Sequence, residues 1–180
     1  MNIPSSMKFE EFQEKGIISS LPKSEKEKYA GFHREAYKDD LKAAKALFTV
    51  SPRWTIIAGY YAMHDIAKLY LAEQHGLKIT GRGVHLATII ALRKVLSDKK
   101  AKEQAVRLLR EAEKVYEIFS THLREGIIPV ILSRGRDERE KSQYYSEKHE
   151  KLAFEKSAEF NEQVVRPFIE LMESMLKDDN

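Results

Sequence analysis

Apolar residues recur every three or four positions along almost the whole chain, which is the spacing of one helix face. The clearest example begins at Ser24, which forms a predicted capping box with Glu27. Its apolar stripe consists of Tyr29, Phe32, Ala36, Leu41, Ala44, Leu47 and Phe48. We therefore predict one long helix that begins near Ser24 and ends near Val50.

Glycine, proline and capping residues divide the rest of the pattern into further helices. Ser51 and Pro52 begin a helix that Gly76 ends, and the two-glycine segment 77–83 is predicted to be a loop. Pro167 is expected to kink the last helix, because proline lacks the N–H that an inner helical turn needs. The other predicted helices span residues 6–16, 52–75, 84–96, 98–124, 129–139 and 146–176.

No strand-like alternation and no internal repeat accompany these helices. The pattern therefore predicts an all-α fold, an up-and-down bundle of long antiparallel helices. We expect residues 1–22 to form an N-terminal extension with one short helix, and residues 23–178 to form the bundle. A chain of 180 residues suits a single main domain of this kind.

Composition excludes several classes of protein. The 31 Lys and Arg residues nearly balance the 28 Asp and Glu residues, so the net charge of +3 is too small for a chain that coats nucleic acid. There is no cysteine, which excludes disulfides, thiolate nucleophiles and cysteine-bound zinc or iron–sulfur clusters. The six histidines show no paired metal-ligand spacing, and we expect neither a metal nor another cofactor.

The most apolar window, residues 54–72, bears on the location of the protein. It contains His64, Asp65 and Lys68 near its middle, which disfavours a membrane span. The first residues lack the basic start and following apolar run of a secretory signal. We therefore predict a cytoplasmic protein without a membrane association.

The same window has little polar face, so its helix is predicted to be buried on all sides, either central in the bundle or between the core and a second subunit. Tyr60 and His64 share one face, and Tyr61 lies one turn from His64 and Asp65. Two roles are open for His64: a hydrogen-bonded core histidine or a site residue. Asp65 needs a cation, because an unpaired buried carboxylate is costly. Lys68, or the arginine-rich segment described next, would supply that cation.

The segment 133–145 mixes basic and acidic residues. Arg136 and Arg139 would lie on one side of a helix, where they suit contact with a phosphate. The alternative is a run of charges on a solvated helix face. Tyr144 and Tyr145 follow this run. Tyr144 comes five positions after Arg139, so the two converge only if the helix ends between them or if they meet across a dimer.

Together these segments resemble the HEPN superfamily, and among its members the small prokaryotic and archaeal ones. The resemblance covers about residues 30 to 176 and rests on Tyr60-Tyr-Ala-Met-His64 followed by Ala67 and Leu69, on Gly76-Leu-Lys, on Gly83-Val-His85, and on Arg139-x4-Tyr144 before a long C-terminal helix. Such proteins are all-α bundles and commonly homodimers. They are often encoded beside a minimal nucleotidyltransferase, as toxin–antitoxin or defence pairs. Many are metal-independent ribonucleases in which a histidine follows an arginine after a few residues.

The ribonuclease pattern is incomplete here, because Tyr144 stands where the histidine after Arg139 would fall, and a hydroxyl with a pKa near 10 is a poor base at neutral pH. We therefore predict a homodimer that binds a nucleotide, an RNA or a nucleotidyltransferase partner, without catalysis of its own. Its site near the dimer seam is predicted to include Tyr60, Tyr61, His64, Asp65, Arg136, Arg139, Tyr144 and Tyr145. The alternative is an endoribonuclease that acts through Arg139, Tyr144 and either His64 or His149. A scaffold without a ligand is a third possibility.

Overall fold

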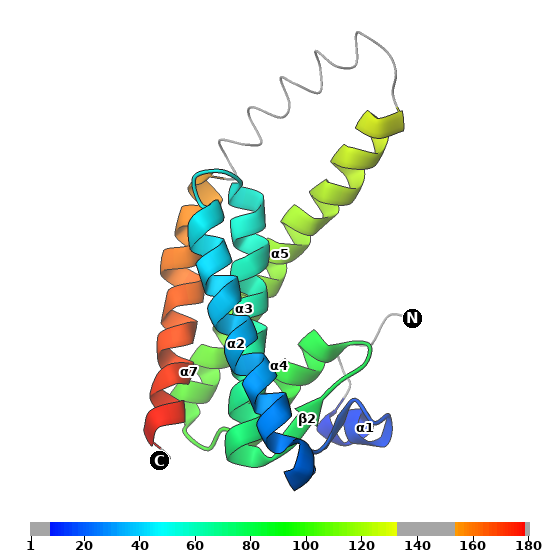
Figure 1. The fold of residues 1–180 in the computed structure, drawn as a ribbon, viewed down its shortest axis with the longest axis vertical. Coiled ribbons are helices and arrows are strands. Elements are labelled where there is room, and N and C mark those ends of the chain that lie inside the picture. The colour runs from blue at the N-terminus through cyan, green and yellow to red at the C-terminus, as the bar shows by residue number, and fades with distance from the viewer. Residues whose placement is uncertain (1–7, 133–153, 179–180) are drawn as a thin grey trace.

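The computed structural model describes residues 8–132 and 154–178, which form an all-α helical bundle with one very short pair of strands (Figure 1). The predicted fold class is therefore confirmed. The helices are α1 (Phe9–Glu14), α2 (Lys23–Leu47), α3 (Pro52–His75), α4 (Val84–Val95), α5 (Lys99–Leu132), the π-helical turn η1 (Asn161–Val165) and α7 (Arg166–Asp178), with residues 154–160 helical ahead of η1. The strands are β1 (Ile18–Ser20) and β2 (Leu77–Ile79).

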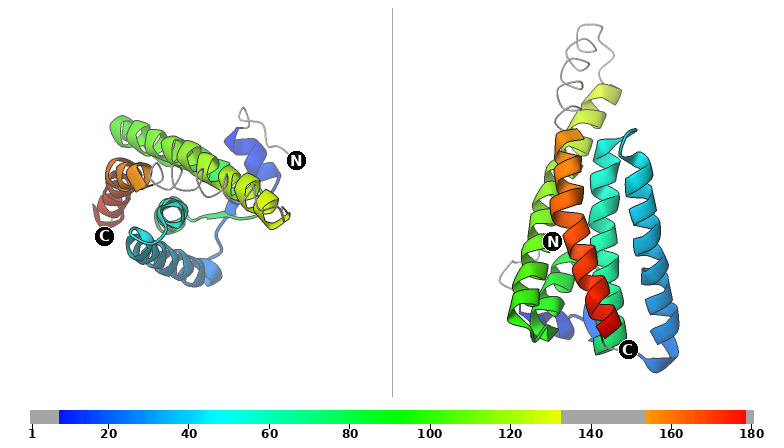
Figure 2. Two further views of the ribbon diagram at one scale, coloured as in Figure 1. Left: turned by 90° about the horizontal axis from the view of Figure 1, so that it is seen from above. Right: turned by 90° about the vertical axis from the view of Figure 1, so that its left-hand side faces the viewer.

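Helix α3 lies in the centre of the bundle, because it is apolar on almost every side. It packs against α2, α4, α5, α7 and β2. Figure 2 shows α2, α5 and the C-terminal helix arranged around it. Its neighbour α2 runs antiparallel to it and is joined to it by the turn at residues 48–51 (Figure 1). Ile56, Met63 and Ile66 of α3 are completely buried, which confirms the predicted central helix.

Several helix ends lie where the sequence places them, and one does not. Helix α3 begins at Pro52 and ends before Gly76, whose φ of 58° is the left-handed conformation that stops a helix. Helix α2 begins at Lys23, directly after Pro22, and no side chain caps it, so the predicted capping box at Ser24 is wrong. Because Pro22 already holds φ at −60°, the chain enters the helix there and Ser24 falls inside the first turn.

The strands β1 and β2 pair in antiparallel fashion, with Ile18 opposite Ile79. The prediction of a loop over residues 77–83 is therefore wrong for its first three residues, since a strand of that length is too short to show alternation. The hydroxyl of Tyr29 donates a hydrogen bond to the carbonyl of Ile79 and accepts one from the N–H of Ile79. The donor–acceptor distance is 3.0 Å in both bonds. The strand pair ties the N-terminal segment to the bundle, and Phe12 belongs to the same hydrophobic core.

Helix α5 is longer than the sequence predicts. It continues through Gly126 and Pro129 to Leu132, so the predicted break after Arg124 and the predicted helix start at Pro129 are wrong. A helix tolerates one glycine at a cost of about 1 kcal/mol, and an interior proline costs about 3 kcal/mol. In the sequence the apolar period continues across both residues. The apolar residues that continue it are Leu123, Ile127 and Val130.

The C-terminal helix is irregular next to its proline. The wider turn η1 ends two residues before Pro167. In a regular α-helix the proline ring collides with the carbonyl one turn earlier, and a wider turn relieves that collision. The expected disturbance at Pro167 therefore takes the form of a π-helical turn.

None of the described helices is both long enough and apolar enough to span a membrane. The predicted helix starts at Ser6 and Ser146 lie outside the described residues, as does the predicted helical stretch 133–139.

Candidate functional site

Five aromatic side chains from three helices meet beside the middle of α3, and we call them the aromatic cluster. Tyr60, Tyr61 and His64 belong to α3, His85 to the first turn of α4, and Tyr116 to α5. The ring of Tyr60 stacks on that of Tyr116, with centroids 4.2 Å apart, and His64 stacks on His85 at 4.3 Å. Tyr60 and His64 also touch edge to face at 4.7 Å, which confirms that they share one face of the helix.

His64 is completely buried, and neither of its ring nitrogens has a hydrogen-bond partner among the described residues. Burial, followed by the nearby His85 and Lys68, lowers the pKa of His64 well below its usual 6.5, so the ring is neutral. A neutral imidazole carries one N–H, and leaving it unpaired in the interior costs about 1–3 kcal/mol. The structure thus places His64 in the core, out of reach of a ligand in this conformation.

The contact between Tyr60 and His85 is a short hydrogen bond inside the aromatic cluster. The hydroxyl oxygen lies 2.7 Å from Nδ1 of His85. Burial raises the pKa of Tyr60 far above its usual 10, so the hydroxyl keeps its proton at neutral pH. Burial also lowers the pKa of His85, which favours the neutral imidazole, so the bond joins two uncharged groups whose donor and acceptor roles are set by the tautomer of His85.

Tyr61 brings the aromatic cluster to the surface. It is 38% exposed, and its hydroxyl lies 3.5 Å from that of Tyr116. The hydrogen bond to Tyr116, followed by partial burial, raises the pKa of Tyr61 to about 12. At neutral pH Tyr61 is therefore an uncharged, accessible hydroxyl that both donates and accepts hydrogen bonds.

Asp65 lies at the centre of an ion-pair cluster that joins α3 to α2. Its Oδ1 is 2.8 Å from Nδ1 of His33 and 3.4 Å from Nζ of Lys68. Burial raises the pKa of Asp65, but the hydrogen bond from His33 and the charge of Lys68 outweigh it and hold the pKa below its usual value. The predicted pairing with Lys68 is confirmed, and His33 is a partner that the sequence did not predict. The other predicted source of a cation, the arginine-rich segment, lies outside the described residues.

Asp40 of α2 is a second carboxyl group near Asp65. Partial burial, followed by the negative charges of Asp65 and Asp39, raises the pKa of Asp40 to about 6. Asp40 also lies close enough to Tyr61 for its charge to affect that hydroxyl. This side of the α2–α3 pair therefore carries a carboxyl that changes its charge close to neutral pH.

Although α3 is central, one narrow face of it reaches the surface. Trp54 is 49% exposed, and Tyr61, seven residues and two turns later, lies on the same face. Asp65 and Lys68 continue this face towards the end of the helix, each with 13% of its side chain exposed. We call these four residues the α3 stripe. It begins with two large aromatic side chains and ends with an ion pair.

The structure describes four of the predicted site residues, all on α3, and the others lie outside the described part of the chain. The residues brought together are Tyr60, Tyr61, His64 and Asp65. The predicted residues outside the described part of the chain are Arg136, Arg139, Tyr144, Tyr145 and His149. Four further residues contact or lie near this group and were not among the predicted site residues. They are His33 and Asp40 on α2, His85 on α4 and Tyr116 on α5.

Among the described residues no group of three or more His, Asp or Glu side chains is arranged to hold a metal ion. Comparisons with protein-family models, with curated proteins and with solved structures found no match.

Proposed function

We propose that this protein is a HEPN-type binding protein: a homodimer that binds a nucleotide, an RNA or a nucleotidyltransferase partner, within a toxin–antitoxin or related defence pair. The observation that carries the proposal is the α3 stripe. A helix that is otherwise core exposes Trp54 and Tyr61 on one face. Tyrosine and tryptophan are enriched where proteins meet partners, because each combines a large apolar surface with one polar group.

The position of the stripe suits a two-fold dimer. In such a dimer both subunits use the same face, so the two stripes would lie against each other. The exposed parts of Trp54 and Tyr61 would then be covered, and the ion pair of Asp65 and Lys68 would lie at the border of the contact. Charged groups are more often found at the rim of an interface than in its centre.

The same residues suit a nucleotide or an RNA as ligand. Exposed aromatic rings stack on bases regardless of sequence, and Tyr61 and Trp54 offer such rings. In our proposal the phosphates contact Arg136 and Arg139, because guanidinium groups bind phosphate oxygens in bidentate fashion.

Light scattering during size-exclusion chromatography tests the dimer. We expect the natural chain at micromolar concentration to have twice the mass of one chain, and the double variant Trp54→Ser/Tyr61→Ser to have the mass of one chain. The matched control is Ile118→Ser on α5, a large side chain that is 56% exposed and not part of the stripe. A natural chain that elutes with the mass of one chain would refute the dimer.

Fluorescence anisotropy with a labelled single-stranded RNA tests the ligand. We expect binding that weakens as salt rises, because phosphate contacts release counterions. Arg139→Ala should weaken binding about tenfold, the effect of losing one charge-assisted contact. An affinity that is unchanged by Arg139→Ala would leave the partner protein as the remaining form of the proposal. Identification of the proteins encoded beside this one, and co-purification with any nucleotidyltransferase among them, would test that form.

One observation favours the alternative, a metal-independent endoribonuclease. His33 is held by Asp65 at 2.8 Å, and a carboxylate that orients an imidazole in this way is a common arrangement for acid–base catalysis. This version of the alternative uses His33 in place of His64 or His149, and it requires the ring, which is 5% exposed, to become accessible to the RNA. Cleavage of RNA in the presence of EDTA that is lost in both His33→Asn and Arg139→Ala would establish it, and intact RNA would exclude it.

A further inference from the structure

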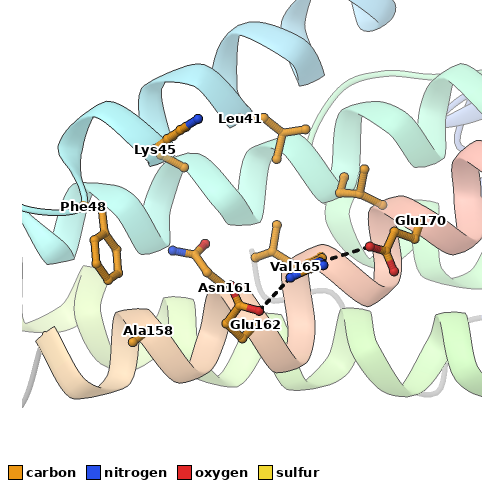
Figure 3. Close-up of a pocket in the computed structure, with 11 residues that line it drawn as sticks. Leu41, Lys45, Phe48, Ala158, Asn161, Glu162, Val165 and Glu170 are labelled. Atoms are coloured by element: carbon orange, nitrogen blue, oxygen red, sulfur yellow. Dashed lines mark hydrogen bonds and ion pairs between the residues drawn. The ribbon is translucent and has the colours of Figure 1, made fainter.

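On the other side of α3 an open slot runs between α2 and the C-terminal helix (Figure 3). Its volume is about 530 Å³, within the range of about 300–1,000 Å³ typical of small-molecule sites. The α2 wall consists of Leu41, Ala44, Lys45 and Phe48. The opposite wall consists of Ala158, Asn161, Glu162, Val165, Arg166, Ile169 and Glu170.

The interior of the slot is apolar, and the packing of η1 gives it its shape. Val165 of η1 approaches α3 so closely at Gly59 that a Cβ added there would lie 3.0 Å from the Cγ2 atom of Val165. This contact holds one wall against α3, while Leu41 and Phe48 stand on the other wall, across the slot (Figure 3). Ala44 and Ala158 are small, which keeps the space between the walls open.

The two basic residues at the rim of the slot differ in their ion pairs. Arg166 is neutralised twice, by Glu162 at 3.0 Å and by Glu170 at 3.1 Å. The side chain of Lys45, in contrast, forms no ion pair or hydrogen bond with any described residue. Asn161 also has no side-chain partner among the described residues, and it points into the slot from the opposite wall (Figure 3). Within the described part of the chain, the slot thus has one cation and one amide without a side-chain partner beside an apolar interior.

We propose that this slot binds a free single-chain amphiphile with a carboxylate head group. The hydrocarbon chain lies along Leu41, Val165 and Ile169, where it is removed from water. The carboxylate accepts hydrogen bonds from Nζ of Lys45 and from the amide of Asn161. A pocket that is mostly apolar, with a few polar groups that fix the orientation, is the usual form of a small-molecule site.

The two cations and two carboxylates at the rim balance, and Lys45 is the cation among them that has no carboxylate partner among the described residues, so we expect it to favour a head group with a single negative charge. A phosphate monoester bears up to two charges and binds best to a free guanidinium group. The one arginine at the rim is already occupied by two carboxylates, and Glu162 and Glu170 would repel a second negative charge. A positively charged head group is disfavoured by Lys45.

Calorimetric titration of the full chain with dodecanoate, below its critical micelle concentration, tests the proposal. We expect one molecule to bind per chain, and dodecyltrimethylammonium, with the same chain and the opposite charge, to bind at least about tenfold more weakly. Lys45→Glu should weaken dodecanoate binding about tenfold or more and remove the preference over the ammonium compound. The matched control is Lys42→Glu, three residues earlier on α2, where the lysine pairs with Asp39 outside the slot.

A second variant tests the place of the hydrocarbon chain. Ala158→Phe should fill the slot and abolish binding of both compounds, while the unfolding transition stays that of a folded bundle. The proposal is overturned if dodecanoate does not bind, if it binds equally well to Lys45→Glu, or if Ala158→Phe leaves binding unchanged. Binding only to vesicles that contain phosphatidylglycerol would also overturn it. Because the slot does not include the α3 stripe, these outcomes do not depend on the proposed dimer.

Discussion

Burial moves the pKa of a histidine and of an aspartate in opposite directions, and this protein has an example of each beside α3. The pKa of His64 falls because the imidazolium form is disfavoured in the core, and the pKa of Asp40 rises to about 6 because the carboxylate form is disfavoured near Asp65. Both residues therefore make the free energy of unfolding depend on pH between acid and neutral conditions. They do so with opposite sign.

His64→Phe tests the buried imidazole. In the unfolded chain His64 takes up a proton near pH 6.5 and in the folded chain it does not, so the natural protein loses stability as the pH falls below that value. The variant keeps a ring in the cluster and removes two unpaired polar atoms, so we expect a gain of about 1 kcal/mol at pH 7. We also expect a shallower loss between about pH 6.5 and pH 5, by up to about 1.4 kcal/mol per pH unit. Urea unfolding across this range measures both effects.

Above about pH 8 the natural protein and His64→Phe should show the same pH dependence, because His64 is neutral in both folded and unfolded chains there. A variant that is less stable at pH 7 by 1 kcal/mol or more, a size typical of lost core contacts, would mean that His64 has a partner that this conformation does not show.

Asp40→Asn tests the raised carboxyl pKa. The folded carboxyl holds its proton more tightly than the unfolded one, so its contribution is complete below about pH 3.8 and is lost as the pH rises through about 6. At pH 7 the charged carboxylate is therefore unfavourable. The shift of about two units corresponds to about 3 kcal/mol, which solvent screening at this partly exposed position reduces to about 1 kcal/mol. We expect Asp40→Asn to be more stable by that amount at pH 7.

Urea unfolding at pH 7 and at pH 4 measures the effect, and the gain should disappear at pH 4. The comparison is Asp39→Asn, which removes an exposed pair with Lys42 and the smallest of the causes that raise the pKa of Asp40, and which should change the stability by less than about 0.5 kcal/mol. Equal effects of the two substitutions at both pH values would show that Asp40 titrates like an ordinary surface carboxyl.

At the scale of the helices, close packing of α3 against η1 explains a glycine in the most apolar helix. Gly59 lies where Val165 and Phe160 approach the α3 backbone. Gly31 of α2, in contrast, has no atom within 4 Å of the place where a Cβ would stand. Close packing therefore requires a glycine at position 59 but not at position 31. The sequence alone does not distinguish these two positions.

Gly59→Ala and Gly31→Ala should change stability in opposite directions. A Cβ at position 59 would stand 3.0 Å from Val165 and 3.3 Å from Phe160, and such overpacking costs about 1–3 kcal/mol. At position 31 only the higher helix propensity of alanine acts, and we expect a gain of about 0.5–1 kcal/mol. Chemical unfolding of both variants gives the two signs. A stabilising Gly59→Ala would show that η1 can move away from α3.

The sequence predicts those elements whose pattern is long and local. The ends of α3 and α4 agree with the prediction to within about one residue, because proline, glycine and a strong apolar period mark them. The strands β1 and β2 were not predictable, since three residues show no period. The predicted end of α5 was wrong, because the helix continues through Gly126 and Pro129, two residues that the local pattern marks as helix breakers.

In the candidate site, too, contacts within one helix could be predicted and contacts between helices could not. Tyr60 and His64 could be paired from a spacing of four residues on one helix. The contacts of Tyr60 with His85, of Asp65 with His33 and of Tyr61 with Tyr116 span 25, 32 and 55 positions. These contacts depend on how whole helices pack, which the local pattern of polar and apolar residues does not specify.

At the scale of the whole molecule, α3 has functional candidates on two sides. Tyr61 of the stripe and Gly59, which contacts the wall of the slot, are two residues apart and so point about 160° away from each other on a helix. The bundle thus covers the central helix on most sides. The α3 stripe exposes one face of the helix to solvent, and the slot lies beside the opposite face. A dimer formed through the stripe leaves the slot of each subunit open to solvent.

The single tryptophan of the chain reports directly on the proposed dimer face. Trp54 is the only tryptophan among the 180 residues, and it is 49% exposed in the single chain. If the α3 stripe forms the seam, Trp54 leaves water on association, and its emission maximum shifts to shorter wavelength. We therefore expect the emission maximum to move to longer wavelength on dilution from micromolar to nanomolar concentration.

Tyr61→Lys, which places a charge in the seam, should show the longer wavelength at every concentration, because burial of an unpaired charge opposes association. The control Ile118→Ser should follow the natural chain. If light scattering shows a dimer while the emission does not change with concentration, the two subunits meet through another face, and the proposed place of the seam is wrong.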